Sequence, residues 1–226
     1  MKLFYENIKD AIRYALSDRY AILVIGTIFL SASLINKYAS NIFRLSNLIL
    51  LYVVGYASFI SWYTINGQDK HPRLNNVKRM AWEGFKKSTI TIFYSIFLAL
   101  AAINANSFYS SGNYLPAILL TILFAMIYLT LIGGLFNRYL NGGVFLKAFD
   151  VPEIVRLLRS FDNRTFIRVI VAVIISQLFV VAVFVNFEQG FSLLELLLTI
   201  STFFLSPFLY IATKRLTGLQ VRNLLN

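Results

Sequence analysis

Cysteine is absent from the 226-residue chain, and histidine occurs only once, at His71. These absences exclude disulfide frameworks, thiol nucleophiles, CxxC redox sites and zinc fingers. Charged residues make up only 14% of the chain, against about 25% in a typical soluble domain. A soluble surface on a protein of this size needs more charge, so the composition indicates an integral membrane protein.

Catalytic signatures are missing as well. The sequence contains no Walker loop, Gly-x-Ser-x-Gly elbow or His-Glu-x-x-His pair. His71 lies between a lysine and a proline, so it is interpreted as a solvated loop histidine rather than a metal ligand. Asp69, Asp150 and Glu153 follow glycine-containing polar segments and are interpreted as helix-capping or first-turn acids. The sequence therefore predicts no enzymatic activity, no cofactor and no metal site.

What the sequence does have is long apolar runs. Six runs lack Lys, Arg and Asp, and the odd-numbered ones are shorter than the even-numbered ones. Because a helix needs about 20 residues to cross a bilayer, the even runs cross comfortably and the odd runs borrow length from the segments before them. The six runs are Tyr20–Ile35, Leu45–Ile65, Ser88–Ile103, Leu115–Phe136, Val169–Val185 and Phe191–Thr213. Within them, Gly55 and the pair Gly133-Gly134 are expected to permit close contact between helices.

The positive charges predict the orientation of these runs. Of the 21 Lys and Arg residues, 19 lie in the N-terminus, in the C-terminal tail and in the two long segments that join the second run to the third and the fourth run to the fifth. The other two are Lys37 and Arg44. By the positive-inside rule, both termini are expected in the cytoplasm. The formal charge of +11 is then explained by juxtamembrane segments that meet anionic headgroups, so nucleic acid is not expected as a partner.

Three segments share one order of parts, namely an amphipathic stretch, a short run, a brief loop, a long run and a polar, glycine-containing end. We call this end the close. The predicted repeats cover residues 4–67, 73–142 and 150–218 of a single membrane domain, 1–226. The closes are Asn66-Gly67, Asn141-Gly142 and Thr217-Gly218, spaced by about 75 residues. Since each repeat holds two runs, all three enter the membrane in the same sense, as parallel repeats.

The amphipathic stretches follow the 3.6-residue helical period. In the first stretch, Ile8, Ala11, Ile12, Ala15 and Leu16 fall on one face. The third stretch begins at Asp150-Val151-Pro152-Glu153, an arrangement that favours a helix start. Such helices are expected in the cytoplasmic interface with their apolar faces buried.

Two segments carry a resemblance to a known family. The loop Asn66–Leu74, with Asp69 and Pro72, and the segment Ala148–Ile154 after Asn141-Gly142-Gly143 are similar to an archaeal membrane-protein family, domain of unknown function 4013. The resemblance extends over nearly the whole chain. It implies a helical membrane architecture and an archaeal cell membrane, and because the family has no assigned activity it transfers no functional site.

The sequence thus predicts an all-α integral membrane protein with six transmembrane helices, arranged as three parallel two-helix repeats with cytoplasmic amphipathic helices. The predicted function is non-enzymatic binding of anionic lipid headgroups, or of a membrane-protein partner, through a basic cytoplasmic face. The alternative is a small transporter or channel with a path between the repeats, for which Glu195, the one acid within a run, is the candidate residue. The candidate contact residues for lipid or partner are Lys78, Arg79, Lys86, Lys87, Arg156, Arg159, Arg164 and Arg168.

Overall fold

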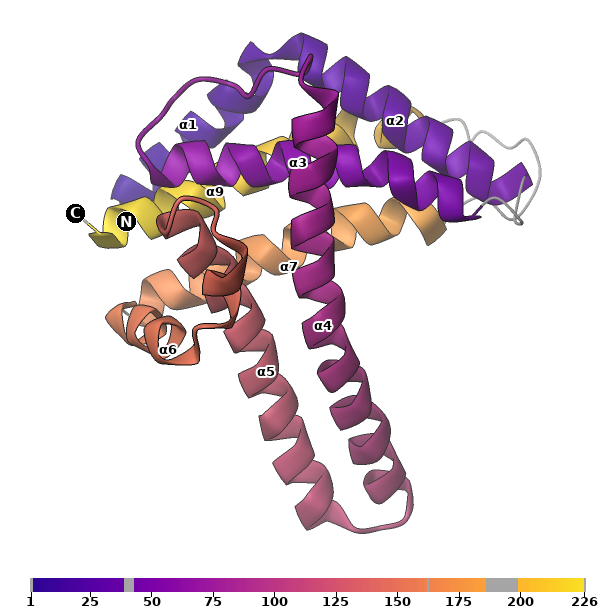
Figure 1. Cartoon of the computed structure of the whole chain (residues 1–226), viewed down its shortest axis with the longest axis vertical. Helices are drawn as coiled ribbons and strands as arrows, with labels where there is room; N and C mark the ends of the chain where they lie inside the picture. Colours follow the sequence, from indigo (N-terminus) through magenta and orange to yellow (C-terminus); the bar gives the residue numbers. More distant parts are fainter. Residues whose placement is uncertain (1, 39–42, 162, 186–198, 226) are drawn as a thin grey trace. The chain divides into compact units, whose positions relative to one another are not determined.

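The structure, a computed structural model, describes residues 2–38, 43–161, 163–185 and 199–225. Every regular element within these ranges is helical, which confirms the all-α class (Figure 1). Glu195 and part of the sixth predicted run lie outside the described residues. In chain order the elements are α1 (Lys2–Ser17), α2 (Arg19–Tyr38), α3 (Phe43–Ile65), α4 (Val77–Ser110), α5 (Tyr114–Leu140), the 3-10 helix η2 (Phe145–Phe149), α6 (Val151–Ser160), α7 (Asn163–Val185), the π-helical turn η3 (Ser201–Leu205) and α9 (Ser206–Leu225).

The chain divides into two compact units. One unit comprises Met1–Phe85 with Asp162–Asn226, and we call it the terminal unit. The other comprises Lys86–Phe161, and we call it the hairpin unit because it holds most of α4 and all of α5. Each unit has its own buried apolar cluster.

The terminal unit is a bundle in which α9 packs against α1, α3 and α7, and α2 packs against α3. Its core is made of large side chains such as Phe29, Tyr56, Ile60 and Ile211, which are almost completely buried. Glycine lets α9 approach α3 closely, because a β-carbon on Gly218 would lie 2.7 Å from the Cβ of Thr64. The apolar runs of this unit therefore pack largely against one another.

The first amphipathic stretch forms α1, which meets α2 at a bend of 78°. Asp18 sits at the bend, and its Oδ1 accepts a hydrogen bond of 2.9 Å from the backbone N–H of Ala21, in the first turn of α2. Ala11 and Ala15 are buried as predicted, whereas Ile12 and Leu16 are 41% and 55% exposed. The predicted apolar face is thus split between the protein core and an outward-facing apolar surface.

The second amphipathic stretch differs from the expectation because it is not a separate helix. It forms the first turns of α4, which continues without interruption to Ser110. These turns cross α3 at two glycines, since a β-carbon on Gly55 would collide with the Met80 carbonyl oxygen and one on Gly84 with the Leu51 carbonyl oxygen. The predicted role of Gly55 in close helix contact is therefore confirmed, and the contact falls at the middle of α3.

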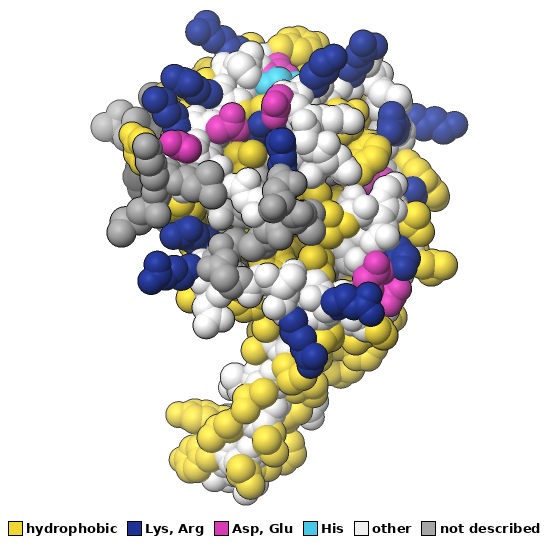
Figure 2. All heavy atoms as spheres, turned by 90° about the vertical axis from the view of Figure 1, so that its left-hand side faces the viewer, with side chains coloured by type: hydrophobic (Ala, Val, Ile, Leu, Met, Phe, Trp, Pro, Cys, Tyr) yellow, Lys and Arg dark blue, Asp and Glu magenta, His cyan; other side chains and the backbone are white. Residues whose placement is uncertain are grey.

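The hairpin unit is built from the rest of α4 with α5, η2 and α6. Gly133 and Gly134 of α5 admit the side chain of Ile154 and the carbonyl oxygen of Ala148, as the glycine pair predicted. Residues 88–137 contain no Asp, Glu, Lys, Arg or His. Figure 2 shows this absence on one face of the hairpin's far end, where only hydrophobic and uncharged side chains are visible.

Among the described residues, three helices are long and apolar enough to cross a membrane, and a fourth counts if the bent α1–α2 pair is one span. The three are Leu48–Ile65 within α3, together with α4 and α5. They differ in burial. In each helix we consider one apolar stretch of 18 residues, here called its window. The window of α3 is 61% buried inside the protein, and those of α4 and α5 are only 17% buried. Several long apolar helices indicate a membrane protein, and the two least buried ones form the hairpin.

Candidate functional site

The loop that follows α3 starts with the Asn66-Gly67 close predicted from the sequence. Gly67 has a φ of +76°, which glycine adopts without strain. Its N–H donates to the carbonyl oxygen of Thr64 at 3.1 Å, and the N–H of Gln68 donates to that of Tyr63 at 2.8 Å. This is a Schellman motif, which ends α3 and turns the chain into the segment 66–76, here called the motif loop.

Arg215 of α9 holds the motif loop against the bundle. Its side chain is only 3% exposed, yet every guanidinium nitrogen has a partner. Nη2 donates to Asp69 Oδ1 at 2.6 Å and Nε donates to Asp10 Oδ2 at 2.9 Å. Nη1 donates to Thr64 Oγ1 at 3.3 Å and to the carbonyl oxygen of Gln68 at 3.2 Å. One side chain thus ties α1, α3, the motif loop and α9 together.

The charge of Arg215 is stabilised by this set of acceptors. Burial on its own disfavours the charged guanidinium, but the hydrogen bonds that it donates to Asp69 and Asp10 outweigh this effect, so the pKa of Arg215 lies above its ordinary value. Asp69 was predicted to be a helix-capping or first-turn acid. The structure corrects this prediction, because the carboxylate of Asp69 pairs with Arg215 and the first turn of α4 is capped by Asn76, whose Oδ1 accepts from the Arg79 N–H at 3.3 Å.

Two aromatic rings extend the network from Arg215. The Arg215 guanidinium lies 4.6 Å from the centroid of the Tyr14 ring, and the His71 ring stacks on Tyr14 with centroids 3.8 Å apart. His71 Nε2 is 2.8 Å from Ser17 Oγ, and Nδ1 is 3.7 Å from Asp18 Oδ2. His71 is therefore a packed residue of the network, which corrects the expectation of a solvated loop histidine.

Burial lowers the pKa of His71 below its ordinary value, although the nearby carboxylate of Asp18 acts in the opposite direction. The Ser17 hydroxyl donates to the Tyr14 carbonyl oxygen at 2.7 Å, so toward His71 the serine acts as an acceptor for Nε2–H. A hydrolase triad requires the serine to donate to the histidine instead. The Ser17–His71–Asp18 cluster therefore has the geometry of a structural contact.

The hairpin unit has a second polar cluster after its own glycine close, where Gly142 has a φ of +66°. Lys147 Nζ lies 2.8 Å from Glu153 Oε2 and 3.0 Å from Asp150 Oδ2. Asn137 Nδ2 also donates to Glu153, at 3.1 Å. These hydrogen bonds, with that from Lys147 the strongest, lower the pKa of Glu153 to about 2.

Asp150 and Glu153 occupy the positions predicted for them at the start of α6. The carboxylate of Asp150 accepts from the Glu153 N–H at 3.4 Å, and Glu153 lies in the first turn. Both clusters fix a loop after a helix that ends on glycine. Neither brings together three potential ligands for a metal ion within the described residues.

Four of the predicted contact residues lie in the terminal unit. Lys78 and Arg164 are exposed. Arg79 is exposed and lies 4.9 Å above the ring of Phe59, and the half-buried Arg168 lies 4.5 Å above the ring of Phe4. Two of the three guanidinium groups among them thus lie over aromatic rings.

The other four contact residues lie in the hairpin unit. Lys86 and Lys87 are half-buried in α4, just before its charge-free part, and Arg156 and Arg159 are exposed one turn apart on α6. Because the two sets of four belong to different compact units, the eight residues form two groups and not one continuous face. Glu195, the candidate of the transporter alternative, lies outside the described residues, and that alternative stays a prediction.

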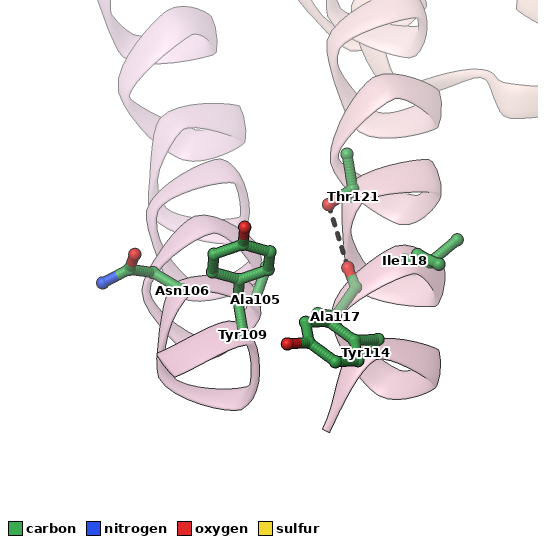
Figure 3. A pocket seen from close by; sticks show the side chains of 7 residues that line it. All are labelled: Ala105, Asn106, Tyr109, Tyr114, Ala117, Ile118 and Thr121. Atoms are coloured by element: carbon green, nitrogen blue, oxygen red, sulfur yellow. Dashed lines mark hydrogen bonds between the residues drawn. The ribbon is translucent and has the colours of Figure 1, made fainter. Parts of the chain in front are cut away.

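Two of the hollows on the described part of the surface lie near residues of interest. One lies near the tip of the hairpin, with a volume of about 420 Å³, and is lined by side chains from the ends of α4 and α5, among them Tyr109, Tyr114 and Thr121 (Figure 3). Its two tyrosine rings meet edge to face at 5.7 Å. The other, of about 360 Å³, is lined by Asn76, Lys78, Arg79 and Trp82. The first hollow is mainly apolar, and the second carries two of the predicted contact residues.

The sequence was also compared with known proteins. A family described as a protein of unknown function, DUF4013, matches residues 40–189, about two thirds of the chain. The chain belongs to this DUF4013 family. No curated protein and no solved structure matches it. The DUF4013 match includes the motif loop and both glycine closes of α3 and α5, while Asp10, Tyr14 and Arg215 lie outside the matched range.

Sequence reasoning about this DUF4013 chain missed the network around Arg215. Its members, Asp10, Tyr14, Asp69, His71 and Arg215, come from three distant segments, and no local spacing joins them. One signal was available, since Arg215 lies two residues after the last apolar run and Asp10 and Asp69 are among the few acids of the chain. A rare acid and a base at the end of an apolar run are candidates for an ion pair.

Proposed function

We propose that this chain is a non-enzymatic multi-pass membrane protein of the cell membrane, in an archaeon, that binds anionic lipid headgroups through basic residues on its cytoplasmic side. In this proposal six helices cross the membrane as three parallel two-helix repeats, with both termini in the cytoplasm. A membrane-protein partner with an acidic surface is the other ligand that the same residues would bind.

The hairpin is the observation that carries the proposal. The windows of α4 and α5 are only 17% buried, and residues 88–137 have no charged side chain. Exposing so much apolar surface to water is costly, whereas lipid covers it at no such cost. Basic residues flank this stretch on both sides, with Lys86 and Lys87 before it and Arg138 after it, as expected at the cytoplasmic ends of two membrane-spanning helices.

Aromatic residues support an interfacial position for the start of α4. Trp82 and Phe85 are 58% and 50% exposed and stack on one another with ring centroids 5.5 Å apart. Tryptophan favours the headgroup layer, where its ring is apolar and its N–H has polar partners. Lys78, Arg79 and Lys86 flank these rings on the same helix, so the first turns of α4 combine the aromatic and basic residues of a membrane-contact helix.

The polar clusters support a non-enzymatic role. The acids of the motif loop and of α6 are engaged in ion pairs that hold helix ends and loops in place. The ring of His71 packs on Tyr14, and Ser17 donates to a backbone carbonyl. The contacts of these groups are structural ones.

The test is lipid retention by the full chain. The chain is purified in mild detergent at low and high salt, and co-purifying lipids are quantified by mass spectrometry. We expect anionic lipids to be enriched, to be lost as salt rises, and to be depleted when the eight contact residues are replaced by Gln. Lys37→Gln/Arg44→Gln, in the predicted outer loop, is the control and should retain them. The proposal would be overturned if anionic lipid is not enriched, or if the amount retained changes neither with salt nor with the eight substitutions.

A further inference from the structure

The hollow at the start of α4 combines cationic and aromatic side chains. Lys78 and Arg79 supply two positive charges, Trp82 supplies an exposed ring, and Asn76 completes the lining. No acid is among the residues that line the hollow, and the acid nearest in the sequence, the half-buried Glu83, directly follows Trp82. The hollow therefore has a net positive character.

The side chains around this hollow are partly held in position. The Arg79 guanidinium lies 4.9 Å above the Phe59 ring of α3, and the Arg79 N–H donates to Asn76 Oδ1. Trp82 stacks on Phe85, with an interplanar angle of 13°. Close contact between Gly55 and Gly84 fixes this part of α4 against α3. A ligand here would meet an arginine and a tryptophan whose freedom is already restricted.

We propose that this hollow is a seat for the phosphate of an anionic membrane lipid, with Lys78 and Arg79 binding the phosphate oxygens and Trp82 lying beside the glycerol region. The inference rests on the proposed function, of which it names one specific site. Trp82 indicates the depth of the hollow in the membrane, because an exposed tryptophan next to basic residues favours the headgroup layer. It lines the same hollow as the two cations. A phosphate held by a guanidinium and an ammonium gains charge-assisted hydrogen bonds.

Tryptophan fluorescence provides a direct readout. The chain has two tryptophans, Trp62 and Trp82, so Trp62→Phe leaves Trp82 as the only reporter. The full chain is reconstituted into phosphatidylcholine vesicles that contain a fixed fraction of brominated lipid. In one set the brominated lipid is phosphatidylglycerol and in the other it is phosphatidylcholine, with the bromine near the glycerol end of the acyl chains in both. We expect the brominated phosphatidylglycerol to quench Trp82 more strongly.

Two matched variants separate a specific seat from general attraction. Lys78→Gln/Arg79→Gln should reduce the preference of Trp82 for phosphatidylglycerol by about 30-fold, since each basic residue contributes about fivefold. Lys9→Gln/Arg13→Gln, at exposed positions of α1 outside the contact residues, removes the same charge and should leave the preference almost unchanged. Circular dichroism and thermal unfolding confirm that each variant is folded.

The outcomes distinguish the two proposals. Equal losses in both variant pairs would overturn the seat while leaving headgroup binding by the basic residues intact. No preference for phosphatidylglycerol in any protein, together with no anionic-lipid retention on purification, would overturn both. Millimolar inorganic phosphate in place of lipid is the third arm, and competition by free phosphate as effective as that by lipid would overturn the lipid as the source of the phosphate.

Discussion

Helix α3 of the terminal unit and the helices α4 and α5, which form the hairpin, have similar apolar sequences but different surroundings. The window of α3 is 61% buried by protein, while those of α4 and α5 are 17% buried. The neighbours of α3 are other helices and the network around Arg215. The difference teaches that apolarity alone does not tell a helix packed by protein from one that presents its surface to lipid, and that burial and glycine contacts make the distinction.

The largest expected effect is at the contact between α3 and α4. Gly84→Ala places a methyl group on the Leu51 carbonyl oxygen, which is backbone and cannot rotate away, so the helices must separate. We expect the free energy of unfolding to fall by about 3 kcal/mol or more, measured by thermal and denaturant unfolding in detergent.

Gly112→Ala at the hairpin turn is the matched control. No heavy atom lies within 4 Å of the new methyl group, and only the φ of +78° resists the change, at a cost of about 1 kcal/mol. If both substitutions cost the same, tight packing is not what distinguishes α3 from the hairpin.

A charge placed on the hairpin should be expelled from the membrane. Ile122 of α5 is 52% exposed and lies within the charge-free stretch. Ile122→Lys is expected to cost about 3 kcal/mol of membrane insertion, measured as the fraction of chains inserted in a translocation assay. Ile12→Lys on α1, where Ile12 is 41% exposed, should cost about 1 kcal/mol or less because the side chain reaches the interface. Equal costs would remove the contrast between the two regions.

A smaller effect is expected when the network of the terminal unit is opened. Arg215→Gln removes two ion pairs and the contact with the Tyr14 ring, but it leaves Asp10 and Asp69 with 49% and 74% of their side chains exposed, so neither acid is stranded. We expect a loss of about 2 kcal/mol of unfolding free energy. Arg13→Gln, at an exposed position of α1, should change it by less than about 0.5 kcal/mol. Matching values for the two would show that the network adds nothing to stability.

The smallest effect is a pH dependence that differs between the two units. Because burial lowers the pKa of His71 in the folded state, the unfolded chain binds its proton first as pH falls, and stability is lost as pH falls below about 6.5. The pKa of Glu153 is lowered to about 2, so the ionised Glu153 side chain stabilises the folded state above a pH of about 4.5. This stabilisation is lost only as the pH falls from about 4.5 to about 2.

The measurement is unfolding free energy between pH 8 and pH 5 for the native chain and for His71→Gln, which should lose the dependence in this range. The groups facing His71 are Asp18, Tyr14 and Arg215, and Asp18→Asn is expected to make the native dependence steeper. A native chain that is equally stable at both ends of this range would contradict the lowered pKa of the half-buried His71.

The sequence predicted the parts of this molecule that depend on local pattern. The helical class, the glycine closes at Gly67 and Gly142 and the first-turn acids of α6 follow from periodicity, turn chemistry and capping. Contacts between distant segments were not accessible in this way. Arg215 meets Asp10 and Asp69 across 205 and 146 residues, and nothing in the local sequence specifies those pairs.

The crossing of α3 and α4 was missed for a related reason. Gly55 was recognised as a site of close approach, but Gly84 lies in a charged amphipathic stretch that was expected to form a helix in the interface. Periodicity describes one helix at a time, so it does not reveal that this stretch continues into a 34-residue helix and packs on the middle of another.

The most direct test of the account is the membrane topology of the hairpin. The chain has no cysteine, so single replacements need no background mutations, and Ser111 at the tip and Ser160 at the end of α6 form a matched exposed pair. On intact cells, a membrane-impermeant maleimide is expected to label Ser111→Cys, and to label Ser160→Cys only after the membrane is permeabilised. Labelling of both positions from the same side would contradict the claim that α4 and α5 cross the bilayer.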